Sequence, residues 1–252
     1  MSSVKDIYKI IDEAAPFSTQ MSFDNSGLLV GDPGMTVKKA LICLDITRPV
    51  VREAKEKGCE LILSHHPVIF NPARKVMSGT ALYDLITGGF SAICSHTNLD
   101  VSLVCGVNRS LSDTLGLVNF TRDGSSECMF TAELPEVMNP ADFLALLKEK
   151  LHAPYARVTS VDQNRKIKKI GFCSGSGGEF VFDAVSTCDA YLTGEAKHHE
   201  LLFALENDFP MFTAGHYATE RIFAGPFAEY LASQISDVEF IVSSSEKDPE
   251  II

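Results

Sequence analysis

Strand-like and helix-like segments alternate along most of this chain, and this alternation limits the folds that it can adopt. Residues 38–46 (KKALICLDI), 59–66 (CELILSHH) and 90–100 (FSAICSHTNLD) each contain a short apolar run typical of a buried strand. Residues 4–15 instead carry their apolar side chains at the spacing of an amphipathic helix. This alternation predicts an α/β fold with mixed, largely parallel sheets flanked by helices.

The second half of the chain repeats the order of the first. Three segments match in sequence order: KKIGFCSG (168–175) with KKALICLD (38–45), AYLTGEAKHH (190–199) with LILSHHPVIF (61–70), and MFTAGHYATER (211–221) with SAICSHTNLD (91–100). Three matches in one order predict two similar α/β lobes. We expect residues 1–120 to form the first lobe and 121–252 the second, packed as one unit, with 121–165 as a small linking segment.

The composition excludes several classes of function. The 252 residues are 45% hydrophobic and 22% charged, which is typical of a globular protein with a sizeable core. A formal net charge of −11 argues against a nucleic-acid-binding surface. No apolar stretch approaches the ~20 residues that cross a bilayer, and the N-terminal residues do not resemble a signal peptide. The 7 scattered cysteines form no CxxC pair, so we expect free thiols and a reducing, cytoplasmic location.

Metal-binding side chains gather where the predicted strands end. In doubly wound α/β sheets the functional residues collect at the carboxyl ends of the strands. All of the 7 histidines except His152 lie just beyond a predicted strand, and they are His65, His66, His96, His198, His199 and His216. Neighbouring side chains inside a strand point to opposite faces, but beyond its end the rings of His65 and His66 can face one point. The pattern therefore indicates a metal site.

A carboxylate accompanies two of these histidines at a spacing of four residues. His216 and Glu220 share one face of a helix that we expect to begin at about Tyr217, and Asp100 follows His96 by the same interval. Imidazole with carboxylate suits Zn, Fe, Ni or Mn, and one carboxylate can bridge two ions. Ligands of this number can hold two ions with open positions left, which distinguishes catalytic from structural sites.

Each of these residues also has an ordinary structural interpretation. Asp100 can cap a helix that begins near Ser102, and Glu220 can complement a helix N-terminus. For His152 and His198 we favour a structural or surface role. Taken together, however, the four chain-distant motifs at equivalent strand ends favour a metal site.

Two further motifs carry a weaker signal. CSGSGGEF (173–180) places glycines between a strand and a helix, where backbone N–H groups can cradle a phosphate or simply form a tight turn. FDNSGLLVG (23–31) can likewise be only a turn ahead of a strand.

The motifs FDNSGLLVG, SHHPVIF, SHTNLD, TGEAKHHE and GHYATER occur in the order found in the GTP cyclohydrolase type 2 homologues, also called Nif-three-like proteins. The chain resembles this family from about Phe23 to Arg221. The resemblance implies two similar lobes, a dinuclear metal centre between them and a ring-shaped homohexamer. It also implies that Glu220 bridges both ions, and that the full ligand set is His65, His66, Asp100, His216 and Glu220.

The chain departs from the family pattern in two places. Phe23 stands where the family usually has tryptophan, and the chain contains no tryptophan. The segment 120–165 is also too short for the large insertion that some relatives carry between the lobes, so we expect no function of that insertion here.

The resemblance implies a metal-dependent hydrolase that acts on a nucleotide or a related anionic small molecule, with GTP ring opening as the reaction in the family's name. The expected partners are a small-molecule substrate and further copies of the chain, without nucleic acid or membrane. No catalytic acid or base can be assigned. Candidate pocket residues are His96, Asn98, Glu195 and His199. The alternative is a non-catalytic metal-binding protein or ring scaffold, because no nucleophile or base with its orienting group stands out beyond the ligands.

Overall fold

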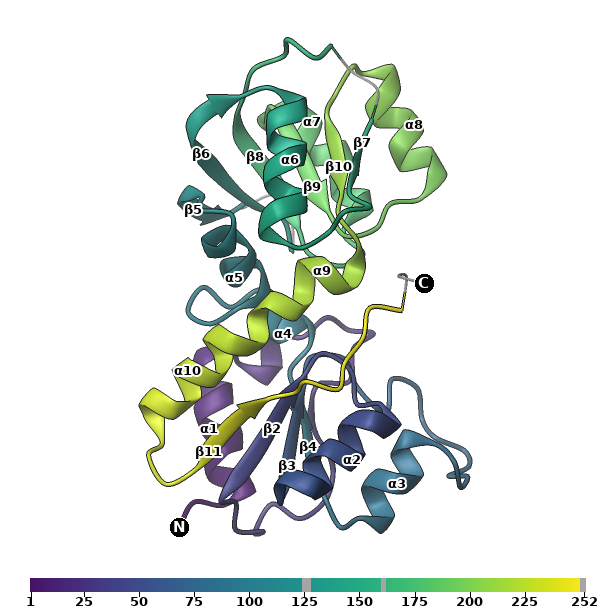
Figure 1. Cartoon of the computed structure of the whole chain (residues 1–252), viewed down its shortest axis with the longest axis vertical. Coiled ribbons are helices and arrows are strands. Elements are labelled where there is room, and N and C mark those ends of the chain that lie inside the picture. The colour runs from purple at the N-terminus through teal and green to yellow at the C-terminus, as the bar shows by residue number, and fades with distance from the viewer. Residues whose placement is uncertain (124–127, 160–161, 250–252) are drawn as a thin grey trace. The chain divides into compact units, whose positions relative to one another are not determined.

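The computed structural model of the chain describes residues 1–123, 128–159 and 162–249. It divides the chain into two compact units, shown in Figure 1. Unit 1 comprises Met1–Gly106 and Phe223–Lys247, and unit 2 comprises Val107–Ile222 with Asp248–Ile252. Both units are mixed α/β structures, which confirms the predicted fold class. Parts of the predicted linking segment and of the second lobe, residues 124–127, 160–161 and 250–252, lie outside the described residues.

Unit 1 is built on a five-stranded sheet of order β1-β4-β3-β2-β11. The strands are β1 (Gly27–Val30), β2 (Lys39–Cys43), β3 (Leu61–Ser64), β4 (Ser91–Cys94) and β11 (Glu239–Val242). All are parallel except β1, which runs antiparallel to β4. Because the late strand β11 pairs with β2, residues 223–247 belong to unit 1, whereas the sequence placed them in the second lobe.

Helices cover both faces of this sheet. The helices of unit 1 are α1 (Val4–Ala14), α2 (Arg48–Lys57), α3 (Ala81–Thr87), α4 (Thr97–Asp100) and α10 (Ala224–Gln234), with a 3₁₀ turn at Phe17–Thr19. The helices α2 and α3 bury Val50 and Leu85 against Leu41 and Ile62 of the strands. On the other face α1 packs against α10, and α10 contacts β2 and β11 (Figure 1). The Thr47 side chain caps the N-terminus of α2.

The end of unit 1 is held to α2 by one buried carboxylate. Glu53 accepts hydrogen bonds from Lys57 Nζ at 2.6 Å, from Ser243 Oγ at 2.6 Å, and from the backbone N–H groups of Ser244 at 2.9 Å and Ser245 at 3.0 Å. Burial opposes its ionisation, but these hydrogen bonds prevail and hold the pKa of Glu53 well below its usual range. The residues after β11 are therefore fixed along the end of the sheet.

Unit 2 is built on a six-stranded sheet of order β5-β6-β8-β9-β10-β7. The strands are β5 (Val118–Arg122), β6 (Phe130–Met138), β7 (Arg157–Val158), β8 (Ile167–Cys173), β9 (Ala190–Thr193) and β10 (Met211–Thr213). Only the pairings of β8 with β9 and of β9 with β10 are parallel among these described strands. This sheet is thus less parallel than the sequence suggested.

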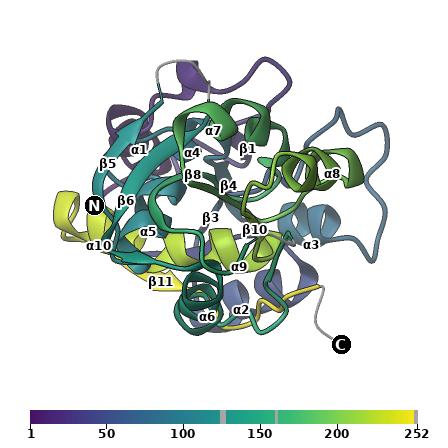
Figure 2. The ribbon, with the colours of Figure 1, turned by 90° about the horizontal axis from the view of Figure 1, so that it is seen from above.

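The helices of unit 2 are α5 (Val107–Thr114), α6 (Pro140–Lys150), α7 (Val181–Thr187), α8 (His198–Glu206) and α9 (His216–Glu220). Two 3₁₀ turns lie at Gly178–Phe180 and Arg221–Phe223. The helices α6 and α7 lie on opposite faces of the sheet (Figure 2). The α6 face holds the main core of the unit, where Phe143 packs against Phe212 with ring centroids 4.8 Å apart. The Asn139 side chain caps α6. No helix in the described part of the chain is both long and apolar enough to cross a bilayer.

The internal repeat corresponds to three parallel strands in each unit. The strands β2, β3 and β4 are neighbours in unit 1, as are β8, β9 and β10 in unit 2. The first pairing keeps the register of the sequence match, since Cys43 pairs with Ser64 and the matching Cys173 pairs with Thr193. The third strands, β4 and β10, differ by one residue from their sequence match.

Candidate metal centre

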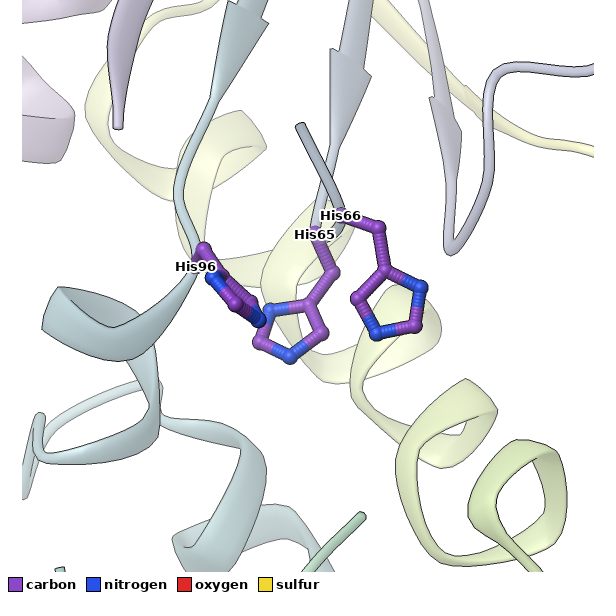
Figure 3. A group of neighbouring side chains, drawn as sticks. All are labelled: His65, His66 and His96. Carbon is purple, nitrogen blue, oxygen red and sulfur yellow. The ribbon is translucent and has the colours of Figure 1, made fainter. Parts of the chain in front are cut away.

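Three histidines meet at one edge of the unit 1 sheet. His65 and His66 directly follow β3, and His96 follows β4 by one residue. Because β3 and β4 are adjacent and parallel, their carboxyl ends lie together, and Figure 3 shows the three rings grouped there. The ring centroid of His65 lies 5.1 Å from that of His66 and 5.1 Å from that of His96. One nitrogen of each ring lies within 4.8 Å of the others, so the three can share a metal ion.

The backbone fixes the start of this group. The N–H of His65 donates to the carbonyl of Cys43 at 3.1 Å, and that of His66 donates to Leu44 at 2.9 Å. These bonds continue the pairing with the β2 chain for two residues past β3. The Ser64 hydroxyl also donates to the His66 carbonyl at 2.8 Å. The backbone that carries the two rings is therefore fixed by hydrogen bonds to the β2 chain and by the Ser64 hydroxyl.

Each of the three rings is also held through its Nδ1 atom by an oxygen. The pairs are His65 with the Ser95 carbonyl at 3.0 Å, His66 with Asp45 Oδ1 at 2.9 Å, and His96 with Asp24 Oδ1 at 2.8 Å. A carbonyl or an ionised carboxylate can only accept, so Nδ1 carries the hydrogen and Nε2 carries the ring's lone pair. Metal-binding histidines in proteins are typically oriented in this way.

Asp24 is the most buried of these anchors, and the sequence reading missed it. Its side chain is fully buried and accepts from His96 and from both the backbone N–H and the hydroxyl of Thr97. Burial favours the neutral acid, but the hydrogen bonds from His96 and Thr97 outweigh it, and the pKa of Asp24 is held well below its usual range. The motif FDNSG therefore does more than form a turn, because it anchors His96 and the start of α4.

Asp100 faces the imidazole group. It is the last residue of α4, and its Oδ1 lies 3.5 Å from Nε2 of the fully buried His65. The alternative of a cap for a helix near Ser102 is wrong, because the helix that follows, α5, begins at Val107. Unit 1 thus brings together three imidazoles and one carboxylate.

Unit 2 holds the second part of the predicted ligand set. His216 and Glu220 begin and end α9, and His216 Nε2 lies 3.0 Å from Glu220 Oε2, as the spacing predicted. His216 Nδ1 lies 3.3 Å from Glu195 Oε1 and 3.4 Å from the hydroxyl of Ser176. That hydroxyl in turn donates to Glu195 Oε2 at 2.9 Å. A carboxylate therefore stands beside Nδ1 of this histidine too.

The glycine loop 173–180 is a tight turn rather than a phosphate cradle. Three of its N–H groups donate to side chains of unit 2: Ser174 to Asn108 Oδ1 at 2.9 Å, Gly175 to Thr219 Oγ1 at 3.1 Å, and Gly177 to Thr193 Oγ1 at 3.1 Å. These donors are engaged within the fold. The loop instead packs closely on α9, since a Cβ added to Gly175 would lie 2.0 Å from Glu220 Oε1.

The remaining candidates have other surroundings. Asn98 is fully buried, and its amide donates to the carbonyl of Ala15 at 2.7 Å and to Ser95 Oγ at 3.0 Å, which is a structural role. His199 is exposed on α8 beside Glu200. His152 and His198 are exposed as well, in keeping with the surface role that we favoured.

The donors in both units fit a divalent transition metal. Imidazole nitrogen with carboxylate oxygen is a ligand set that such ions accept, and His65, His66, His96 and His216 are each oriented by an oxygen at Nδ1. A site built from anchored donors loses little side-chain entropy when an ion binds. The histidine groups can therefore bind metal.

Comparison with known proteins gives a consistent family match. A model of the Duf34/NIF3 family (NGG1p interacting factor 3) matches residues 2–249. A Clostridium perfringens protein named GTP cyclohydrolase 1 type 2 homolog is 34% identical over 258 aligned residues, which cover 98% of each chain. A Helicobacter pylori protein named GTP cyclohydrolase 1 type 2 is 31% identical, with 92% of this chain and 93% of that protein covered.

Solved structures agree with this match. A hypothetical protein from Staphylococcus aureus superposes with a TM-score of 0.92 at 29% identity, with 99% of each chain covered. HcgD from Methanocaldococcus jannaschii, solved in its reduced form, superposes with a TM-score of 0.80 at 28% identity, with 96% of this chain and 98% of that one covered.

Proposed function

Because this chain belongs to the Duf34/NIF3 family, we propose that it is a dinuclear metal-dependent hydrolase acting on a nucleotide or a related anionic small molecule. The proposed cofactor is two divalent transition-metal ions per chain, chosen from Zn, Fe, Ni and Mn. When bound, such ions polarise the bond under attack and lower the pKa of a water molecule. The proposed ligands are His65, His66, Asp100, His216 and Glu220.

The observation that carries this proposal is the orientation of the imidazoles. His65, His66 and His96 each place Nδ1 on an oxygen, which is the orientation typical of histidines that bind a metal through Nε2. Histidines that only fill a core do not require three neighbouring rings to be anchored through the same nitrogen. His96 is not a ligand in the family pattern, and we propose that it contacts the substrate or completes the coordination.

Glu195 and Ser176 are proposed to orient His216. They hold its Nδ1 and direct Nε2 toward Glu220, which fixes the two ligands of α9 relative to each other. Relatives named for GTP cyclohydrolase make GTP the first substrate to test. We further propose a cytoplasmic homohexamer, for which light scattering should give a mass several times 27.5 kDa. A clean monomer at low micromolar concentration would refute the assembly.

The test of catalysis is a screen of the metal-reconstituted protein against GTP, other nucleotides and phosphoesters. We expect turnover that disappears on chelation, returns with added metal and is lost in Glu220→Gln. His152→Gln, at an exposed position, is the matched control and should retain the rate. Tight metal binding without turnover of any tested compound would instead support the alternative, a non-catalytic metal-binding protein or ring scaffold.

A glycine substitution gives a prediction that is independent of the ligands themselves. Gly175 has φ +59°, and a Cβ there would force Glu220 Oε1 to move. Gly116 has a similar φ of +69°, but its Cβ would meet nothing within 4 Å. Gly175→Ala is therefore expected to weaken metal binding by about tenfold or more relative to Gly116→Ala, because both carry similar backbone strain and only one displaces a ligand. Metal titration of the two variants decides the point, and equal affinities would contradict the role of Glu220.

A further inference from the structure

Two adjoining cavities in unit 2 form a groove beside the pair formed by His216 and Glu220. Each has a volume of about 290 Å³, and they adjoin at Arg157, Leu201 and Thr213, which line both. They lie where the edge strand β7 and the strand β10 meet α8. A cavity of this size is at the lower end of the range for sites that hold small molecules.

One end of the groove is apolar. It is lined by Leu201, Leu202 and Leu205 of α8 and by Met211 of β10. Leu202 is 43% exposed and Leu205 is 47% exposed, although a helix of a globular protein usually turns its leucines toward the core. These side chains offer a surface on which an aromatic ring or a short apolar group can be removed from water.

Arg157 stands at the junction of the two cavities. It is exposed, and its guanidinium forms no ion pair within the described ranges, although the chain as a whole carries a net charge of −11. An exposed guanidinium that borders an apolar cavity is suited to bind a carboxylate, sulfonate or phosphate from solution.

The other end of the groove is polar and leads to the candidate metal ligands of unit 2. Tyr155, Glu195 and Gly215 line it. Gly215 precedes His216 in the chain, and Glu195 Oε1 lies 3.3 Å from His216 Nδ1. A molecule that fills the groove therefore extends from the leucines of α8, past Arg157, to the partner of a proposed metal ligand.

We propose that this groove binds a small molecule that combines an aromatic or short apolar part with an anionic group. The apolar part lies on Leu201, Leu202 and Leu205, and the anionic group contacts Arg157. The inference rests on the proposed function only in treating this molecule as the substrate. Binding itself requires no metal, so it is tested separately from catalysis.

The test uses two fluorescent probes with the same ring system. 8-Anilino-1-naphthalenesulfonate carries a sulfonate, and N-phenyl-1-naphthylamine does not. We expect Arg157→Met to weaken binding of the sulfonate probe by about tenfold and to leave the neutral probe within about twofold, because only the charged contact is lost. Leu202→Glu should weaken both probes. Arg52→Met, at an exposed arginine of α2 in unit 1, is the control and should change neither.

The measurement is made on the protein as purified and repeated after chelation, with circular dichroism to confirm the fold of each variant. A result in which chelated protein binds the probe but never shows turnover leaves the groove in place and rejects only the hydrolase. Equal sulfonate affinity in Arg157→Met and the parent protein would overturn the proposal. So would a Leu202→Glu variant whose mass falls in light scattering while its probe binding rises, since a second copy of the chain would then cover the groove in the parent protein.

Discussion

Replacing Glu220 with alanine is expected to remove nearly both metal ions from each chain, whereas His65→Ala or His66→Ala should remove about one. The Glu220 carboxylate is buried at 4% exposure, and its Oε2 lies 3.0 Å from His216 Nε2. In the proposed centre this carboxylate bridges both ions. Without it two cations would face each other in a pocket where low dielectric makes their repulsion costly. Loss of one histidine leaves the other imidazole and the shared carboxylate in place.

The measurement is metal content per chain after dialysis against a mild chelator. Glu220→Gln should behave like Glu220→Ala, because the amide cannot supply the bridging charge, and the exposed His152→Ala should behave like the parent. If Glu220→Ala kept both ions while either variant of His65 or His66 lost both, the bridge would be assigned to the wrong residue.

Glu53→Ala should produce a large loss of stability, although Glu53 lies outside the metal centre. The carboxylate is 5% exposed and accepts hydrogen bonds from Lys57 and from three consecutive serines, 243–245. Truncation leaves these donors without their charged acceptor, which costs about 3 kcal/mol in the free energy of unfolding. For a chain of this length we expect the melting temperature to fall by about 6–12 °C.

Calorimetry checks this prediction, with the exposed Glu56→Ala on the same helix as the control. The pH dependence has a defined sign. The pKa of Glu53 is lowered on folding from its ordinary value of 4.5, so its contribution to stability is present above pH 4.5 and is lost as the pH falls below it. The difference between parent and Glu53→Ala should therefore shrink in acid. A difference that persists unchanged toward pH 2 would show that it comes from packing rather than from the carboxylate.

Local sequence patterns predicted the elements of the fold better than their partners. Helix α2 after Thr47 and helix α6 after Asn139 could be located because capping and apolar spacing act within a few residues. The pairing of β11 with β2 could not be located in this way, because it joins segments about 200 residues apart and leaves no local signal. The predicted first lobe, residues 1–120, therefore did not include β11.

The candidate site shows the same difference between local features and distant partners. The histidines at strand ends were recognised because their chemistry and their place after an apolar run are both visible in the sequence. Their anchors were not, since Asp24 lies 72 residues from His96, and Asp45 lies 21 residues from His66. The sequence did contain two signals for these anchors. One is the acidic residue Asp24 in the FDNSG motif, and the other is Asp45 at the end of the predicted strand 38–46. Asn98 also has a distant partner, because its amide donates to the carbonyl of Ala15, which lies 83 residues earlier in the chain.

Metal binding by the anchored imidazoles is the central property proposed for this protein, and titration of chelator-stripped protein with Co²⁺ tests it most directly. Cobalt bound by imidazole and carboxylate gives visible absorption bands, so one titration reports both the number and the type of ligands. We expect saturation at about two ions per chain, with intensity lost in His65→Ala and nearly abolished in Glu220→Ala. Two results would contradict metal binding at these residues. One is a folded parent protein with no cobalt absorption, and the other is equal absorption in the parent, His65→Ala and Glu220→Ala.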